Sequence, residues 1–201
     1  MPELVVQSDE RVGFIGQTRT GKTFLVERLA DEQPRVIAID SKERLKWKGY
    51  FLTDDPIAAL LEDKVIYRPR TGVPPKDWWE GALQSLVERG GGVIYLEEMP
   101  VIVTQNVIPE GLAKIFRVGA ELGVGVWYSA QESTTIHNTV LRQAQQLVLF
   151  YNQGTSDREK MLGIVGDMAE VTAHLPNYDF IVFEQGVTKD GAPIPVYRAV
   201  P

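Results

Sequence analysis

Eight consecutive residues have the types and the order of a loop that binds phosphate groups. The run is Gly16-Gln17-Thr18-Arg19-Thr20-Gly21-Lys22-Thr23, in which two glycines separated by four residues precede a lysine and a hydroxyl residue. Glycine permits the backbone angles that point successive amides at phosphate oxygens, and a following helix adds its positive N-terminal dipole. Lys22 would then lie between the β- and γ-phosphates of ATP, and the Thr23 hydroxyl would be a ligand of Mg²⁺. The run predicts binding of ATP and Mg²⁺, and a Gly/Thr-rich loop without a ligand is the less favoured interpretation.

Two acidic residues follow an apolar run and have the chemistry that ATP hydrolysis requires. Glu97 and Glu98 come directly after Val93–Leu96. A hydrolase needs one carboxylate beside the metal and usually another that orients or deprotonates the attacking water. Because ligands bind at the carboxyl ends of strands in open α/β sheets, we expect the pair to lie beside the phosphate loop. Glu97 is expected on the Mg²⁺ side and Glu98 as the base, and solvated loop charge is the alternative.

A single amide follows another apolar run. Gln131 comes shortly after Val124–Tyr128. A glutamine at the tip of a strand can donate to a phosphoryl oxygen and accept from water, which suits a site for phosphate cleavage. An ordinary loop amide is the alternative interpretation.

Short apolar runs alternate with stretches of helical periodicity, which predicts the elements that must position these side chains. The expected strands are Val12–Ile15, Val36–Ile39, Val65–Tyr67, Val93–Leu96, Val124–Tyr128 and Leu147–Phe150. This alternation indicates an α/β fold with a mostly parallel central sheet flanked by helices, since parallel neighbours need crossover segments on both faces. No linker divides the sequence, so residues 1–201 are expected to form a single domain.

Two helices and a terminal hairpin have signals of their own. Apolar residues at helical spacing predict a helix that extends to Leu122, with Pro109 in its first turn. Ser156 and Glu159 match a capping box that would open a second helix. Near the end, Phe180–Phe183 and Pro195–Arg198 flank a turn-rich stretch with Asp190-Gly191, which predicts a C-terminal β-hairpin at an edge of the sheet.

Composition excludes several classes of protein. At 201 residues and 44% hydrophobic, the chain can bury a core, and no apolar run approaches a membrane span. The start, Met1-Pro2-Glu3-Leu4, has no secretory leader, so a soluble, cytoplasmic protein is expected. With no cysteine and only His137 and His174, any metal should have oxygen ligands. A net charge of −6 argues against a broadly basic nucleic-acid surface, although local patches can differ in sign.

Four stretches together resemble the FtsK/HerA superfamily of P-loop ATPases, and most of all its short viral genome-packaging members. They are residues 16–23, Val36-Ile37-Ala38-Ile39-Asp40-Ser41-Lys42, Val93–Glu98 and Gly123-Val124-Gly125-Val126-Trp127-Tyr128-Ser129-Ala130-Gln131. The resemblance covers about residues 10–150 and departs from the usual pattern at Ser41, in place of proline, and at Glu97, in place of aspartate. It implies a RecA-like P-loop NTPase fold and assigns Gln131 to sensing the γ-phosphate.

The resemblance also implies a mode of action. Members of this superfamily form rings, usually of six subunits, that pump double-stranded DNA with energy from ATP. For this chain it implies packaging of a viral genome in the host cytoplasm or on the virion, with a capsid vertex or portal protein as a further partner. In such rings an arginine from one subunit completes the neighbouring site, and both Arg117 and Arg142 are candidates. Each of them could equally be a surface charge.

Two groups of basic residues are candidates for contact with DNA. The first contains Lys42, Arg44, Lys46 and Lys48 around Trp47, and the second contains Arg68, Arg70 and Lys76 near Trp78-Trp79. Basic side chains attract phosphate groups without selecting a sequence, as a translocating motor requires. A solvated face is the alternative for both groups. The two tryptophans are expected to pack a helix or an interface, because a duplex offers no unpaired bases for stacking.

Other functions remain open at this stage. A small P-loop kinase would also fit the length, with Arg68 and Arg70 as lid residues. A DNA-pumping ATPase of the same superfamily outside viruses and a nucleotide-dependent assembly protein are further alternatives. Glu97, Glu98 and Gln131 favour hydrolysis, since a kinase avoids a well-oriented water. Salt-sensitive stimulation of ATP hydrolysis by DNA would separate the motor from the kinase and the assembly protein.

Overall fold

The computed structural model describes residues 4–188 and 194–199, and these residues build one nine-stranded sheet in the order β3-β4-β2-β5-β6-β1-β7-β8-β9. Strands β1 to β7 pair in parallel, whereas β7-β8 and β8-β9 pair antiparallel. The strands are β1 (Arg11–Ile15), β2 (Val36–Asp40), β3 (Phe51–Thr53), β4 (Lys64–Tyr67), β5 (Gly92–Glu97), β6 (Val124–Ala130), β7 (Gln146–Phe150), β8 (Asp179–Glu184) and β9 (Val196–Arg198). All six predicted strands are confirmed, as is the mostly parallel α/β sheet.

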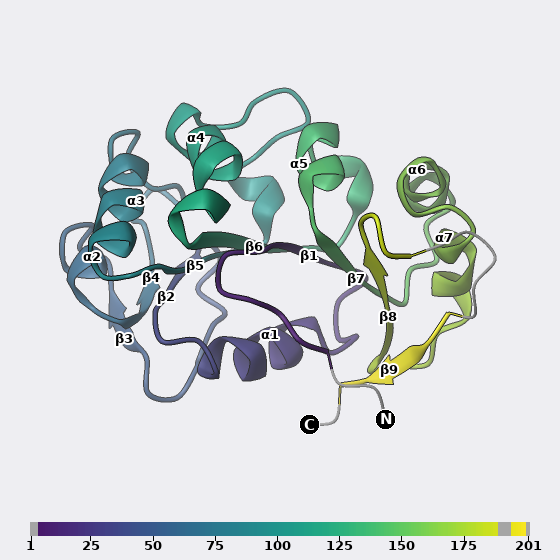
Figure 1. The fold of residues 1–201 in the computed structure, drawn as a ribbon. Coiled ribbons are helices and arrows are strands. Elements are labelled where there is room, and N and C mark those ends of the chain that lie inside the picture. Colours follow the sequence, from purple (N-terminus) through teal and green to yellow (C-terminus); the bar gives the residue numbers. More distant parts are fainter. Residues whose placement is uncertain (1–3, 189–193, 200–201) are drawn as a thin grey trace.

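Helices cover both faces of this sheet (Figure 1). The α-helices are α1 (Lys22–Asp31), α2 (Ala58–Leu61), α3 (Trp78–Glu88), α4 (Glu110–Val118), α5 (Asn138–Gln143), α6 (Thr155–Val165) and α7 (Met168–Val171). Helix α1 lies on one face, and α3, α4 and α5 lie on the other. No helix in the described part of the chain is long and apolar enough to cross a membrane.

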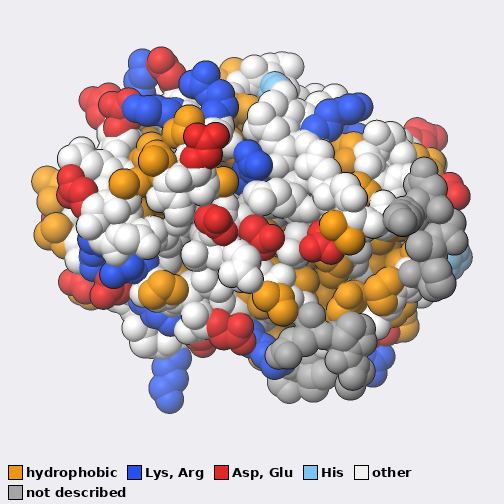
Figure 2. All heavy atoms as spheres, in the orientation of Figure 1, with side chains coloured by type: hydrophobic (Ala, Val, Ile, Leu, Met, Phe, Trp, Pro, Cys, Tyr) orange, Lys and Arg blue, Asp and Glu red, His pale blue; other side chains and the backbone are white. Residues whose placement is uncertain are grey.

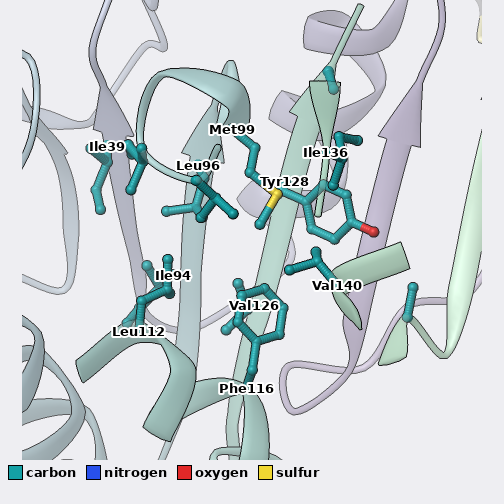
Figure 3. Close-up of a cluster of buried hydrophobic side chains, with 14 of the residues drawn as sticks. Ile39, Ile94, Leu96, Met99, Leu112, Phe116, Val126, Tyr128, Ile136 and Val140 are labelled. Carbon is teal, nitrogen blue, oxygen red and sulfur yellow. The ribbon is translucent and has the colours of Figure 1, made fainter. Parts of the chain in front are cut away.

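Buried side chains form one apolar cluster on each face of the sheet, because neighbouring residues of a strand point to opposite sides. Figure 3 shows part of the larger cluster, where side chains from β5 and β6 meet α4 and α5. Its members include Ile94, Leu96, Val126, Tyr128, Leu112, Phe116 and Val140. On the α1 face, Tyr95 and Trp127 pack from the same two strands. Both central strands are therefore covered on both sides. This packing fixes where their carboxyl ends lie at the edge of the sheet.

The C-terminal hairpin lies where the sequence predicts it. Strands β8 and β9 pair antiparallel and form one edge of the sheet. The expected turn at Asp190-Gly191 lies outside the described residues. At the other edge, the sequence analysis missed β3, since a strand of three residues with exposed Phe51 and Leu52 has no buried alternation to detect.

Three details of the predicted helices are wrong. Helix α4 ends at Val118, and Ala120–Leu122 continues as a 3₁₀ turn with Leu122 exposed. Pro109 is the cap before α4 and not part of its first turn. The capping box is also absent: α6 begins after Gly154, because the Asn152 side chain accepts a hydrogen bond from the Gly154 amide and turns the chain early. Ser156 is consequently the second residue inside the helix.

Strand β6 passes so close to the segment before β1 that one of its residues must be glycine. A Cβ atom on Gly125 would lie 2.4 Å from the Ser8 carbonyl oxygen and 2.6 Å from that of Glu10. Because backbone atoms cannot move aside cheaply, Gly125→Ala is expected to lower the free energy of unfolding by about 1–3 kcal/mol. Urea denaturation with an unchanged m-value would measure this loss.

A matched control lies in α6. A Cβ atom on Gly163 would have no described atom within 4 Å. Gly163→Ala should therefore leave stability unchanged or raise it by up to about 1 kcal/mol, since alanine is the better helix former. Equal losses for both variants would contradict the close approach of β6 to the segment before β1.

Candidate functional site

The phosphate loop connects β1 to α1 in the predicted strand-loop-helix order. Its two glycines are required by close packing as well as by backbone angles. A Cβ atom on Gly16, which has φ 154°, would lie 2.6 Å from the Phe150 Cβ atom, and one on Gly21, with φ 102°, would lie 2.9 Å from the Tyr178 ring. Thr20 is buried and donates its hydroxyl to the Gln17 carbonyl at 2.8 Å, which braces the turn. The loop thus has a tight curve, without side chains at Gly16 and Gly21, of the kind that phosphate groups need.

Lys22 reaches back along this loop. Its Nζ donates to the carbonyl oxygens of Gly16 at 2.6 Å and Gln17 at 2.7 Å. Burial lowers the pKa of Lys22 to about 8, and the negative charges of Glu98 and Glu97 limit that drop. A cation this poorly hydrated interacts strongly with an anion placed beside it. The position and the electrostatics of Lys22 both suit a phosphate group.

Glu97 ends β5 as a buried carboxylic acid with an unused oxygen. The residue is 6% exposed, and its Oε2 atom is buried without a hydrogen-bond partner in the described structure. Burial, together with the nearby charges of Asp40 and Glu98, raises the pKa of Glu97 to about 7. Such an acid gains stability from a cation or from hydrogen-bond donors.

Glu98 is held by contacts from two other parts of the chain. It follows β5 in the left-handed region at φ 58°, which turns its side chain toward the neighbouring strand ends. The Gln131 amide donates to Glu98 Oε2 at 2.7 Å, and Lys42 Nζ lies 3.3 Å from the same oxygen. Gln131 Oε1 in turn accepts from the Thr18 hydroxyl of the phosphate loop at 2.9 Å. A chain of contacts therefore connects the phosphate loop to the second acid of the pair.

The loop, the acid pair and Gln131 border one cleft of about 380 Å³. Strand β6 lies between β1 and β5, and all three are parallel, so their carboxyl ends open on the same edge. The lining residues are Thr18, Arg19, Gly21, Lys22, Thr23, Phe24, Arg44, Glu97, Glu98, Ser129, Ala130, Gln131 and Tyr178. The predicted juxtaposition of the two glutamates with the phosphate loop is thus found in the structure.

The two candidate arginines lie at the other end of the sheet from the cleft of their own chain. Both Arg117 and Arg142 are exposed, and neither lines the cleft. Arg11 begins β1, at the end opposite the phosphate loop. Its side chain donates to the Phe116 carbonyl, and its backbone carbonyl accepts from the Gln145 amide. Arg117 and Arg142 are chain neighbours of these contacts and share that end of the sheet.

Two residues of the first basic group, Lys42 and Arg44, lie at the cleft, which the sequence did not predict. Lys42 pairs with Glu98, and Arg44 lines the cleft, where its charge partly offsets the rise in the pKa of Glu97. Trp47 is buried and stacks on Tyr95 with 5.4 Å between ring centroids. Lys46 and Lys48 remain exposed on the same loop. The spacing of these residues in the sequence could not show which of them lie at the cleft and which lie in solvent, since that depends on where β2 ends relative to β5.

The second basic group is not arranged as a lid. Arg68 donates to Asp40 Oδ2 at 3.0 Å and to the Leu45 carbonyl, and Arg70 pairs with Asp54 on the surface. Neither lines the cleft. Trp78 and Trp79 are buried in α3, which confirms helix packing over base stacking. On the face seen in Figure 2, basic and acidic side chains are interspersed among the described residues.

Tyr178 is a cleft residue that the sequence analysis missed. Its ring lies beside Gly21, at one end of the phosphate loop. The contact with Gln131 is made from another part of the loop, by Thr18. The backbone of Tyr178 has φ 70°, and its carbonyl accepts from the Ala199 amide of the C-terminal segment. The side chain is 39% exposed. No local motif marks this residue, because β8 and β9 bring it to the loop from about 150 residues away in sequence.

Comparison with solved structures shows the fold. The structure resembles the genome packaging NTPase B204 from Sulfolobus turreted icosahedral virus 2 in complex with ATPγS, with a TM-score of 0.82, 15% identity and coverage of 98% of this chain and 100% of that one. For B204, the DNA-packaging ATPase from Sulfolobus turreted icosahedral virus, the TM-score is 0.77 at 18% identity, covering 98% and 100%. For EssC (ATPases 2 and 3) from Geobacillus thermodenitrificans it is 0.59 at 11% identity, covering 95% of this chain and 40% of that one.

These similarities show that the chain has the P-loop NTPase fold of B204. No protein-family profile matches the sequence, and no curated protein matches it.

Proposed function

We propose that this chain is an ATPase of the FtsK/HerA superfamily that translocates double-stranded DNA and packages a viral genome into a procapsid. The observation that carries the proposal is the chain of contacts from Thr18 through Gln131 to Glu98 across one cleft. It links the loop that would bind phosphate to the acid that would activate water. The fold shared with B204 over the whole chain supports packaging.

The residues around the cleft fit Mg²⁺ and ATP. Thr23 and Glu97 would hold the metal, since both line the cleft and the buried Glu97 Oε2 has no hydrogen-bond partner in the part of the chain that the structure describes. When bound, Mg²⁺ would neutralise part of the charge on the phosphates. Lys22 and the amides of residues 16–23 would hold the triphosphate itself, and the curve enforced at Gly16 and Gly21 leaves room for it.

Hydrolysis would then proceed by direct attack of water. Glu98 accepts a proton from a water molecule while the water oxygen forms a bond to the γ-phosphorus. The bond from the γ-phosphorus to the bridging oxygen breaks, and its electron pair leaves with ADP. Gln131 holds Glu98 and would orient the water through the same amide group. The proton on Glu98 passes to solvent with release of inorganic phosphate and ADP.

Ring assembly would explain why the candidate arginines lie at the end of the sheet opposite the cleft. In a head-to-tail ring, one end of each subunit faces the other end of its neighbour. Arg117 or Arg142 would then enter the neighbouring cleft, where an arginine is worth about 10³–10⁵ in rate. Lys22→Ala subunits would lack a working cleft but still supply the arginine.

Mixing experiments test this arrangement. Arg117→Ala and Arg142→Ala are each expected to be inactive alone if they act in trans, and mixing with Lys22→Ala should partly restore ATP hydrolysis. The rescue should follow only the arginine that enters the neighbouring site. Absence of rescue for both arginines would contradict the trans arrangement.

Tyr178 is expected to contact the nucleobase, because it borders the Gly21 end of the loop and not the Gln131 end. Stacking on an aromatic ring contributes about 1–3 kcal/mol per base. Tyr178→Leu should therefore raise the KM for ATP about tenfold with little change in kcat, and Tyr178→Phe should retain the wild-type value. Inhibition by inorganic triphosphate, which has no base, should be the same in all three proteins. A weaker effect of triphosphate on Tyr178→Leu would instead indicate damage to the loop.

DNA-dependent hydrolysis is the decisive test of the proposed function. We expect double-stranded DNA to stimulate ATP hydrolysis, with the stimulation falling as salt rises. The measured mass of the nucleotide-bound assembly should be that of the expected ring, a hexamer. Packaging in the host cytoplasm or on the virion would further require a capsid vertex or portal protein, which co-assembly with purified procapsids would detect. A rate of ATP hydrolysis that is the same with and without DNA would refute translocation.

A further inference from the structure

A short 3₁₀ turn, Ser133–Thr135, follows the glutamine that connects the phosphate loop to Glu98. Only Glu132, in an extended conformation, separates Gln131 from Ser133. The end of β6 fixes the backbone of Gln131 on one side, so the turn must fix it on the other. A shift of the turn would therefore move the Gln131 amide relative to both of its partners.

Asp157, the third residue of α6, accepts two hydrogen bonds from this turn. Its Oδ1 atom accepts from the Ser133 hydroxyl at 2.8 Å and from the Thr134 amide at 2.8 Å. Asp157 is 7% exposed, and Ser133 is fully buried. Because a buried carboxylate needs such donors, these bonds hold the turn in one position relative to α6.

The same carboxylate packs against the segment that supports the phosphate loop. A Cβ atom on Gly154 would lie 2.8 Å from Asp157 Oδ2, so the carboxylate lies directly against the segment between β7 and α6. In that segment, the Tyr151 carbonyl accepts from the Gln17 amide of the phosphate loop at 3.0 Å. Strands β6 and β7 are the two neighbours of β1 in the sheet. Asp157 therefore connects the chain after β6 to the chain after β7, on either side of the phosphate loop.

Lys160, about one turn later on α6, holds the other end of the 3₁₀ turn. Its Nζ donates to the Ile136 carbonyl at 2.6 Å. Burial lowers the pKa of Lys160, and the negative charge of Asp157 limits that drop. Both charged residues of α6 lie outside the lining of the cleft. Any influence of α6 on the reaction must therefore pass through the segments that it holds.

We infer that Asp157 is a positioning residue for ATP hydrolysis, which keeps the Gln131 amide in register with the phosphate loop and with Glu98. The carboxylate fixes the turn after Gln131 against the segment that supports the phosphate loop. Without it, the amide would remain present but would no longer be held where the water must be oriented. The inference rests on the proposed function, since it takes Glu98 as the base and Gln131 as the group that orients the water.

Removing the carboxylate tests this role through the division between kcat and affinity. Asp157→Ala should lower kcat for ATP hydrolysis about 10- to 100-fold, because the amide of Gln131 is misplaced. The affinity for ATP should stay within about twofold of wild type, since Lys22 and the loop amides are unchanged. Asp157→Asn should retain most of the wild-type kcat, because its amide oxygen can still accept from Ser133 and Thr134. Steady-state kinetics and calorimetry with ATPγS would measure the two quantities.

A double-mutant cycle with Gln131→Ala separates positioning from a general loss of stability. If Asp157 acts through Gln131, Asp157→Ala should lower kcat no further in the Gln131→Ala background. Its effect on the midpoint of urea unfolding should be the same in both backgrounds. Ser133→Ala removes one of the two donors and should cause a smaller loss of kcat that also disappears in that background. This variant provides the same test if Asp157→Ala does not fold.

A matched serine controls for the loss of a hydroxyl hydrogen bond. Ser85 Oγ donates to the Leu60 carbonyl at 2.6 Å, between α3 and α2 and outside the lining of the cleft. Ser85→Ala should leave kcat unchanged in the wild-type and Gln131→Ala backgrounds.

The outcomes distinguish the inference from the proposed function. Losses of kcat that multiply for Asp157→Ala and Gln131→Ala, or a loss of ATP affinity in place of kcat, would overturn the inference and leave the proposed function standing. If Gln131→Ala alone hydrolyses ATP at the wild-type rate, the assigned cleft and the inference both fail. The cycle is measured without DNA, so its result does not depend on translocation.

Discussion

Lys22→Ala is expected to weaken ATP binding about 100-fold or more and to abolish measurable hydrolysis. Lys22 is buried, and burial lowers its pKa to about 8, so its charge is poorly hydrated and strongly attractive to an anion. Loss of a buried charge partner typically costs 2–5 kcal/mol in affinity, where about 1.4 kcal/mol is tenfold. Titration calorimetry with ATP and Mg²⁺ would measure the loss of binding.

Folding must be checked in the same variant. Lys22 donates to the carbonyls of Gly16 and Gln17, so its removal also takes two hydrogen bonds from the loop. Thermal unfolding of Lys22→Ala in buffer without nucleotide should stay close to wild type, since the glycine turn and Thr20 remain. Lys114→Ala is the control for loss of a lysine elsewhere. Unchanged hydrolysis in Lys22→Ala would refute the assignment of the phosphate loop.

Glu98→Gln is expected to bind ATP normally and to lower kcat by about 10²–10⁴. The amide has the shape of the carboxylate and can still accept from Gln131, but it cannot take a proton from water. Because only the transition state depends on that proton transfer, the change should lie in kcat and leave the affinity for ATP unchanged. Single-turnover kinetics together with binding measurements would separate the two quantities.

A second acid variant provides the contrast. Glu97→Gln should raise the Mg²⁺ concentration needed for half-maximal hydrolysis, since Glu97 is proposed beside the metal and its Oε2 has no partner among the described residues. If Glu98→Gln weakened ATP binding while Glu97→Gln lowered only kcat, the roles of the two acids would have to be exchanged.

The positions of the strands and of the phosphate loop could be predicted from the sequence, and the reason is local. Val93–Leu96 and the other apolar runs are buried on both faces, so each gives a continuous apolar signal. The phosphate loop needs glycine at Gly16 and Gly21 for a local reason as well, since its own backbone has positive φ at both positions. Parallel pairing then brings the ends of β1, β5 and β6 to one edge without further information.

Other parts of the site could not be predicted because they depend on contacts between distant segments. Tyr178 reaches the phosphate loop only through the antiparallel edge of the sheet. Lys42 and Lys46 are alike in sequence, and only the geometry at the end of β2 separates the one that pairs with Glu98 from the one that stays in solvent. The register of α6 depended on the side chain of Asn152 and not on the capping pattern at Ser156.

The stacking of Trp47 on Tyr95 gives the protein an intrinsic optical reporter beside the candidate site. Indole emission depends on the contacts and polarity around the ring, and Trp47 belongs to the same loop as Lys42. Replacing Trp78, Trp79 and Trp127 with phenylalanine would leave Trp47 as the single tryptophan, so stopped-flow indole emission could follow that loop without an attached dye. The time at which the signal changes, relative to phosphate release, would order the mechanical and chemical steps of one turnover.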